Sequence, residues 1–454
     1  MLKGERRWSM ILRDPVHGLV AFEGPAEKVV TTLLATRELQ RLRHVRQLGF
    51  TSMVFPGAEH TRFAHSVGSA HVMVRFLARL RSVQAVLPAE LRLDVEAEMD
   101  AIAGALLHDL GHGPFSHLWE GLLPRAPHHE QWTTDILCDE STDVYQALTA
   151  LSAGMPERIA ELIRGRHRLG YLARAVSGAL DVDRFDYLLR DSHMTGVRYG
   201  IYDLDWLLQA LTFAELPCGT TGAVTWVVAV EGRKGLPPME GFFLARQFMY
   251  QQVYHHKATR AADVLMRAIL LRLSQLVLDG QAPAHTPQAV LKAIRGEPVA
   301  VGSYLQLDDP RMLTCMRDWA QGSDKVLADL TGRLFARRLP KTLPLPEGSA
   351  HAQLREAMHS AAVPVVAAAG FDTTLYLWLD GPSDVPYREP EGDVPEGLWV
   401  QLKHQPLRRL GEISFLLREL RNKAIERPRL IFPAEARAEV QAAVAPLFDQ
   451  LESE

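Results

Sequence analysis

Apolar residues recur at helical spacing through the first two-thirds of this chain, and this periodicity limits the folds that are open to it. Between about Leu33 and Arg198, apolar residues recur mostly at helical spacing. A clear example is the run Val67, Ala70, Val74, Leu77 and Leu80. Because a helix with this spacing can bury one whole face, the pattern predicts a mainly α-helical bundle.

Two segments within or just after this helical part stand out as separate elements. The stretch around Trp226–Val230 alternates and is rich in β-branched residues, which predicts a β-hairpin. Leu244–Leu273 keeps the helical period, which predicts one long helix.

The composition changes near Leu278, where glycine, proline and alanine replace the periodic pattern. The segment Leu339–Ala350 is rich in proline and is typical of a connector. We therefore expect a helical core over 1–278, a connecting region over 279–350 with helices and this Pro-rich segment, and a smaller α/β region over 351–454.

The last of these regions contains three predicted elements. Thr373–Leu379 and Leu398–Leu402 have the composition of strands, and Ala434–Leu451 is expected as an amphipathic helix. The sequence of this region indicates no particular chemistry.

Charge, hydropathy and cysteine content exclude several classes of protein. The chain has 50 Lys and Arg against 54 Asp and Glu, a formal charge of −4, whereas a dedicated nucleic-acid binder needs a basic surplus. No apolar run has the length of a membrane span, and the N-terminus lacks the apolar core of a signal peptide. Three cysteines without a CxxC pattern support neither a disulfide framework nor a zinc knuckle. We expect a cytoplasmic protein without a membrane or dedicated nucleic-acid partner.

Histidine is concentrated in one part of the chain. Eight of the 18 histidines lie between positions 60 and 129, which is less than one sixth of the sequence. They are His60, His65, His71, His108, His112, His117, His128 and His129. A single histidine is most often an ordinary core or surface residue, but a cluster of this size indicates a site.

Three residues of this part can contribute to a metal site. His65 lies at the start of a predicted helix, and the pair His108–Asp109 lies where another helix ends. Helix ends that meet inside a bundle can direct imidazole and carboxylate groups into one cavity. A fourth ligand is then needed from elsewhere in the chain.

The fourth ligand can come from a later helix that carries Asp183, Asp186 and Asp191. Carboxylates on an apolar helix are costly to bury unless they are paired or bound to a metal. The alternative is that this helix exposes them to solvent, in salt bridges with Arg184 and Arg190.

Two histidines and two carboxylates suit a first-row transition ion such as Mn, Fe, Ni, Co or Zn. Open positions on such an ion accept water or a phosphate oxygen, and a nucleotide can bring its own Mg.

Nearby groups suit phosphate chemistry. Anionic oxygens can be held by Arg62, His112, His117 and Arg184, and His129, followed by Glu130, can give a proton to a leaving group. This set predicts hydrolysis of a phosphoester or phosphoanhydride.

Longer motifs in the chain resemble one known family. His65, His108–Asp109 and Asp183 match the H…HD…D signature of the HD-domain phosphohydrolases, so an HD-domain helical bundle is implied. FPGAEHTRFAHSVG at 55–68, LLHDLGHGPFSH at 106–117 and DVDRFDY at 181–187 are similar to motifs of the deoxynucleoside triphosphate triphosphohydrolases, most of all the branch with the sterile-alpha-motif HD protein. The resemblance covers about Leu12 to Asp263, and we expect the sterile-alpha-motif domain itself to be absent.

The resemblance implies a role for each matching residue. The metal would be held by His65, His108, Asp109 and Asp183. The triphosphate would be contacted by Arg62, His112, His117, Arg184 and Arg246. His129, oriented by Glu130, would donate the proton, with His112 as the next candidate. The sugar pocket, which excludes a ribose hydroxyl by close packing at C2′, would be lined by Gln47, Leu48, Tyr187, Asp191 and Tyr254.

Two departures from the family pattern bear on the substrate pocket and on activation. Tyr250 stands where the family has a histidine in the substrate pocket, so it is expected among the substrate contacts. Ala35 stands where vertebrate relatives have the Asp that recognises guanine in an activator site, although Gln40 and Arg43 of that site are kept. The resemblance implies a homo-oligomer, a tetramer or a dimer, with a nucleotide effector at Gln40 and Arg43, and Ala35 predicts that GTP is not the activator.

Residues and resemblance together predict a metal-dependent hydrolase that converts deoxynucleoside triphosphates to deoxynucleoside and inorganic triphosphate. Two alternatives are open: the same site could act on a monophosphate or a cyclic dinucleotide, or the chain could be a catalytically silent nucleotide-binding regulator. The four filled ligand positions argue against the regulator. No GYP motif follows the His-Asp pair, which argues against the cyclic dinucleotide class.

Overall fold

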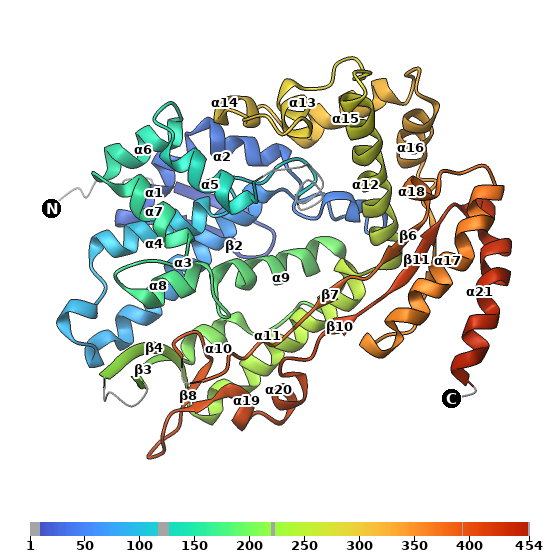
Figure 1. Ribbon diagram of the computed structural model, residues 1–454. Coiled ribbons are helices and arrows are strands. Elements are labelled where there is room, and N and C mark those ends of the chain that lie inside the picture. The colour runs from blue at the N-terminus through green and yellow to red at the C-terminus, as the bar shows by residue number, and fades with distance from the viewer. Residues whose placement is uncertain (1–9, 117–126, 219–222, 393, 453–454) are drawn as a thin grey trace.

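The structure is a computed structural model that describes residues 10–116, 127–218, 223–392 and 394–452 (Figure 1). Helices make up most of it, and the strands among these residues form four small sheets. The expected fold class, a mainly helical bundle with a smaller α/β C-terminal region, is confirmed.

Three helices at the centre of the bundle carry the predicted metal ligands. Helix α3 (Arg62–Val83) contacts both α4 (Val95–Leu107) and α9 (Val182–Thr195). Each begins with a side-chain cap, because Thr61, Asp94 and Asp181 accept a hydrogen bond from the backbone amide three residues later. Around them lie α1 (Gly24–Leu34), α2 (Arg37–Arg41), α5 (His129–Cys138), α6 (Asp143–Leu151), α7 (Met155–Ile163), α8 (Gly170–Val176) and α10 (Leu204–Gln209).

The periodic residues of α3 form part of the core, as the sequence predicts. Val67, Ala70, Leu77 and Leu80 are at most 5% exposed, and Val74 packs half-buried against the same core. Burial of this stripe fixes the rotation of α3, and so determines which of its side chains face α4 and α9.

Two antiparallel hairpins accompany the bundle. The predicted one is confirmed as β3 (Leu211–Cys218) and β4 (Ala223–Glu231). The other, β1 (Met10–Asp14) with β2 (Gly18–Phe22), was not expected. Its turn is held by the Asp14 carboxylate, which accepts hydrogen bonds from two backbone amides of the turn, and by Gly18, whose φ is 71°.

The long helix expected over Leu244–Leu273 is wrong, because the structure breaks it in two. Helix α11 (Leu236–Met249) runs into a π-helical turn over Tyr250–Tyr254, and α12 (Lys257–Leu278) begins afresh with His256 as its cap. The apolar period continues across the break, so the pattern alone does not reveal it. Such π turns are frequent at functional sites.

The connecting region is more ordered than its composition indicates. It contains α13 (Gln288–Ile294), α14 (Val301–Tyr304), α15 (Asp309–Trp319), α16 (Lys325–Phe335) and the strand β5 (Lys341–Pro344). The Pro-rich segment is therefore not only a connector, because β5 pairs with β11 (Arg429–Phe432), which in turn pairs with β6 (Trp378–Asp380).

Two of the three elements expected in the C-terminal region are confirmed. They are the strand β8 (Trp399–Gln401) and the last helix, α21 (Arg437–Glu452), which packs beside α17 (Ala352–Ala368) at the edge of the molecule (Figure 1). The strand expected over Thr373–Leu379 is wrong for most of its length. Asp372 caps the short helix α18 (Thr373–Tyr376), and β6 begins only at Trp378.

The C-terminal region also joins the bundle. Strand β8 pairs with β4 of the bundle and with β9 (Arg408–Arg409), while β7 (Ser383–Asp384) pairs with β10 (Ile425–Glu426). Two short helices, α19 (Leu410–Ile413) and α20 (Phe415–Leu420), complete the region. The segment between β7 and β8 thereby lies close to α9, one of the helices that carry the predicted metal ligands.

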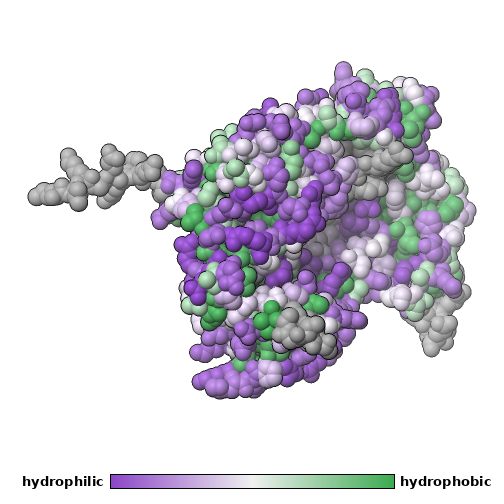
Figure 2. All heavy atoms as spheres, turned by 60° about the vertical axis from the view of Figure 1, so that its left-hand side comes forward, coloured by the Kyte–Doolittle hydropathy of each residue, from purple (hydrophilic) through white to green (hydrophobic). Residues whose placement is uncertain are grey.

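On the face shown in Figure 2, hydrophobic residues are scattered in small groups among hydrophilic ones. Such a surface is ordinary for a globular protein. Among the described residues, no helix is both long and apolar enough to cross a membrane.

Candidate functional site

The four predicted metal ligands lie together where α3, α4 and α9 meet. The Nε2 atom of His65 lies 3.3 Å from Nε2 of His108 and 2.9 Å from Oδ1 of Asp183. Oδ1 of Asp109 lies 3.4 Å from Nε2 of His108. His65 and Asp183 come from the first turns of their helices, whereas His108 caps the C-terminus of α4.

Hydrogen bonds fix which ring nitrogen of each histidine faces this cluster. Nδ1 of His65 lies 2.8 Å from Oδ2 of Asp186, and Nδ1 of His108 lies 2.9 Å from the carbonyl oxygen of Ala105. Both partners are acceptors, so each Nδ1 carries a proton, and in the neutral rings each Nε2 presents a lone pair to the other residues. Two such lone pairs beside two carboxylates fit a divalent cation.

The pKa values of the cluster also indicate a site for a cation. Burial lowers the pKa of His65, but hydrogen bonds to Asp183 and Asp186 outweigh burial and raise this pKa to about 10. Burial raises the pKa of Asp183, but hydrogen bonds to His108 and His65 outweigh it and hold this pKa below its usual range. The cluster thus favours a cation, either a proton or a metal ion.

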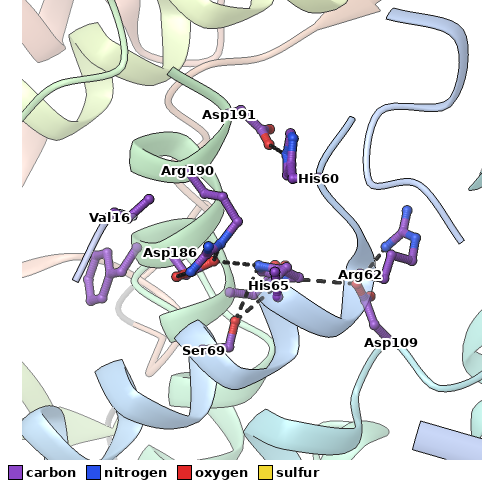
Figure 3. Close-up of polar contacts among 12 residues, drawn as sticks. Val16, His60, Arg62, His65, Ser69, Asp109, Asp186, Arg190 and Asp191 are labelled. Carbon is purple, nitrogen blue, oxygen red and sulfur yellow. Dashed lines mark hydrogen bonds and ion pairs between the residues drawn. The ribbon is translucent and has the colours of Figure 1, made fainter. Parts of the chain in front are cut away.

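Asp186 lies behind His65 and connects three elements, as Figure 3 shows. Its fully buried carboxylate accepts two hydrogen bonds of 2.8 Å from Arg190 and lies 2.6 Å from Nε2 of His17, in the turn after β1. A Cβ at Gly68 of α3 would lie 1.9 Å from this carboxylate, so only glycine leaves room for it. The expected alternative of a solvent-exposed helix face does not hold here, because Arg190 and Asp186 are paired but buried.

A cavity of about 500 Å³ opens beside the metal ligands. Fourteen of the predicted site residues line it: Gln47, Leu48, Arg62, His108, Asp109, His112, His129, Glu130, Asp183, Arg184, Tyr187, Asp191, Tyr250 and Tyr254. His65 is fully buried behind them. His117 lies outside the described residues, and Arg246 does not line this cavity.

Basic groups surround the metal ligands. The buried Arg62 donates a 2.5 Å hydrogen bond to Oδ2 of Asp109 and a 3.1 Å bond to the Ser116 hydroxyl. Arg184 pairs with Asp181 at 3.1 Å. Oδ1 of Asp109 lies 3.1 Å from Nε2 of His112, whose pKa is held well below the usual value by burial and by Arg62.

His129 lies on the other side of His112. The two rings stack with their centroids 3.8 Å apart. The loop after Asp109 can lie against α5 only because Gly111 has no side chain: a Cβ there would be 2.2 Å from the His129 carbonyl oxygen. This close approach brings the histidines of two separate motifs together.

The opposite wall of the cavity is built around Asp191. One carboxylate oxygen lies 2.7 Å from Nε2 of His60 (Figure 3), and the other accepts a 2.7 Å hydrogen bond from the Tyr254 hydroxyl. Tyr254 ends the π turn and is therefore held at both its backbone and its hydroxyl. The Oε1 atom of Gln47 is buried without a hydrogen-bond partner among the described residues.

Sequence reasoning missed several residues of the cavity wall. Thr259, Arg260, Asp263 and Arg267 line it from one face of α12. Arg260, Asp263 and Arg267 are spaced three and four positions apart in a mainly apolar helix, which was a usable signal. The role of Asp181 as the cap of α9 was also missed.

Comparisons with known proteins agree with this geometry. The family model described as "HD domain" matches residues 62–191, which include all four metal-ligand positions. An uncharacterized protein of Bacillus subtilis, YwfO, is 33% identical over 431 residues, which are 94% of this chain and 92% of that protein. The crystal structure of a phosphohydrolase from Bacteroides thetaiotaomicron has a TM-score of 0.74 and 25% identity, and the match covers 94% of this chain and all of that one.

A relative that matches over a shorter stretch has a named activity. The deoxynucleoside triphosphate triphosphohydrolase SAMHD1 homolog of Dictyostelium discoideum is 35% identical over 219 residues. The match covers 45% of this chain and 40% of that protein, so the chain spans less than half the length of this relative.

Proposed function

Because this chain belongs to the HD-domain family of metal-dependent phosphohydrolases, we propose that it hydrolyses deoxynucleoside triphosphates to deoxynucleoside and inorganic triphosphate. The observation that carries this proposal is that the Nε2 atoms of His65 and His108 meet the carboxylates of Asp109 and Asp183 beside one cavity. The likeness to a named triphosphohydrolase supports the choice of substrate.

His65, His108, Asp109 and Asp183 would hold a divalent first-row ion, which supplies positive charge near the α-phosphate and the acidity that activates water. Arg62 is held in place by Asp109 and Ser116, so its remaining N–H groups are oriented before a substrate arrives. Arg184 adds a second planar donor from the same helix as Asp183. These two arginines would bind phosphate oxygens.

His129 would give a proton to the departing 5′ oxygen of the deoxynucleoside. The stacking against His112 holds its ring in the cavity, next to the arginine and carboxylate groups. An alkoxide leaves poorly unless it is protonated, so a donor at this place speeds the cleavage.

The wall formed by Leu48 and Tyr254 would select the sugar. Tyr254 is tied to Asp191, which His60 holds in turn, so the phenol ring cannot yield easily to an additional 2′-hydroxyl. A ribose would bring a polar group that either clashes or loses its water. The unpartnered Oε1 of Gln47 is suited to accept a hydrogen bond from a sugar hydroxyl.

A panel of nucleotides tests this assignment. The metal-loaded protein is incubated with dATP, ATP, dAMP and cyclic di-AMP, and the products are separated by chromatography. We expect rapid cleavage of dATP and little cleavage of the other three. Preferential turnover of dAMP or of the cyclic dinucleotide would replace the proposal with the corresponding phosphohydrolase activity.

A further inference from the structure

A second cavity, of about 480 Å³, lies next to the first. The two share the wall residues Ser177 and Arg184, so they are neighbours along the start of α9. Its lining contains three arginines from three parts of the chain: Arg184 in α9, Arg246 in α11, and Arg388 in the segment between β7 and β8.

Arg246 stands at the boundary between the cavities. Its guanidinium carbon lies 5.0 Å from the ring centroid of Tyr250, which lines the first cavity. The C-terminal segment holds this guanidinium: it donates to the carbonyl oxygens of Val385 and Pro386, and it pairs at 3.0 Å with Asp384. The negative charge of Asp384 is therefore already compensated by Arg246.

Arg388 differs from the other two arginines in its surroundings. Its neighbours in sequence are buried and anchored: the Tyr387 hydroxyl bonds to the Glu389 carboxylate, which pairs at 3.2 Å with Arg421. Arg388 itself is exposed and makes no hydrogen bond or ion pair with any described residue. The only other acidic residue of the described lining, Glu396, is also exposed. The backbone thus places Arg388 at this cavity, and no acidic residue among the described ones pairs with its guanidinium.

We propose that Arg388 is a further substrate-binding residue, supplied by the C-terminal region at the cavity where Arg184 and Arg246 are expected to hold the distal phosphates of the nucleotide. The inference rests on the proposed function, since Arg184 would hold the phosphate nearest the metal ligands and the chain of phosphates would continue past it. Planar guanidinium groups bind phosphate oxygens in pairs of hydrogen bonds, and three of them suit a polyphosphate better than a single phosphate.

Binding of inorganic tripolyphosphate tests this without any need for turnover. Isothermal titration calorimetry compares the metal-loaded wild type, Arg388→Ala and Arg437→Ala at one fixed Mg concentration, so that chelation by the ligand is equal in all three. Arg437 is a matched control, because it is exposed at the start of α21 and lines neither cavity. We expect Arg388→Ala to weaken tripolyphosphate binding roughly tenfold or more, and Arg437→Ala to change it less than about twofold.

Orthophosphate and dATP complete the design. Binding of orthophosphate should be equal in all three proteins, because one phosphate fits beside Arg62 and Arg184 alone. With dATP, Arg388→Ala should raise KM with little change in kcat, since the distal phosphates are held equally in ground and transition states. Arg388→Lys should recover part of the affinity, because it restores the charge without the planar fork.

Two results would overturn the inference. One is tripolyphosphate affinity in Arg388→Ala equal to that of wild type, and the other is an equal loss of orthophosphate affinity. Neither result depends on the proposed reaction. If wild type cleaves dATP and Arg388→Ala binds tripolyphosphate normally, the triphosphohydrolase activity is supported and only the role of Arg388 is refuted. Conversely, a wild type that leaves dATP intact would refute the reaction, whatever the variant binds.

Discussion

At the scale of single residues, the partners of His65 and His108 decide which nitrogen each ring turns toward the cavity. The motif predicts both histidines as ligands, but it does not predict that Asp186 and the Ala105 carbonyl fix their tautomers. Asp186 was one of three carboxylates that the helical segment offered. Their spacing could not separate them, because only the packing of α9 against α3 shows that Asp183 faces the cluster while Asp186 lies behind it.

Asp186→Asn tests this supporting role. An amide can present its N–H to Nδ1 of His65 and favour the wrong tautomer, so we expect metal affinity to fall roughly 10- to 100-fold in protein that remains folded by circular dichroism. Asp183→Ala should retain no metal. The metal content is measured by elemental analysis after dialysis against a chelator, with Asp205→Asn, an exposed carboxylate of α10, as control. Equal retention in Asp186→Asn and wild type would show that the tautomer does not matter.

His129→Ala tests the proton donor. A positioned general acid contributes roughly 10² to 10⁴ in rate, so turnover of dATP should fall by that factor while metal content stays unchanged. His128→Ala provides the comparison, because that residue is adjacent but lies outside the cavity lining. If both variants turn over dATP at the same rate, the proton comes from another group, with His112 the next candidate.

At the scale of elements, the break between α11 and α12 shows what hydrophobic periodicity cannot predict. The apolar period predicts a continuous helix, but the π turn places the Tyr254 hydroxyl against Asp191, and α12 starts separately with His256 as its cap. Helical periodicity does not record one additional residue in a turn, so the break could be found only in three dimensions. The β1–β2 hairpin was also not predicted, because it is stabilised by contacts of Asp14 and His17 with α9, which is distant in sequence.

Asp263 of α12 gives this helix a pH-dependent stability. Burial outweighs the nearby Arg260 and Arg267 and raises the pKa of Asp263 to about 6. In the unfolded chain the pKa of Asp263 is 3.8, so the folded chain binds this proton more tightly. The contribution of Asp263 to the unfolding free energy therefore falls as the pH rises from about 4 to about 6.

Asp263→Asn removes this titration while it keeps an acceptor for Arg260. We expect the variant to gain about 1 to 3 kcal/mol of unfolding free energy over wild type at pH 7.5, and less at pH 5. Urea denaturation at the two pH values measures the difference. A gap between the two proteins that is the same at both values would contradict the assigned pKa.

At the scale of the whole molecule, the sequence predicted the bundle and its metal ligands but not the contribution of the C-terminal region. The ligands carry a motif that can be recognised in the chain, whereas Arg388 is distant in sequence from Arg184 and Arg246 and lies in a segment without periodicity. The pairing of β8 with β4 and the contacts of Arg246 with Asp384, Val385 and Pro386 bring that segment to the site. The domain boundaries at 278 and 350 stay predictions.

Assembly and activation also belong to this scale. We propose a homo-oligomer with a nucleotide effector near Gln40 and Arg43, which here bond to each other at 2.7 Å. Ala35 is exposed at the end of α1 and offers no acceptor to guanine, which forfeits the roughly 1 to 3 kcal/mol of a hydrogen bond to a charged group. Hydrolysis of dATP should therefore be no faster with GTP than without it, measured together with the sedimentation coefficient. Strict dependence on GTP would show that another residue recognises guanine.

The products of dATP test the central claim most directly. Ion chromatography of a digest by the metal-loaded protein, sampled through the first turnovers, separates deoxyadenosine, dAMP, dADP, phosphate, pyrophosphate and triphosphate. Attack at the α-phosphorus predicts deoxyadenosine and inorganic triphosphate in equal amounts from the first sample onward, with no dADP or dAMP at any time. Early dADP with phosphate, or dAMP with pyrophosphate, would contradict the account.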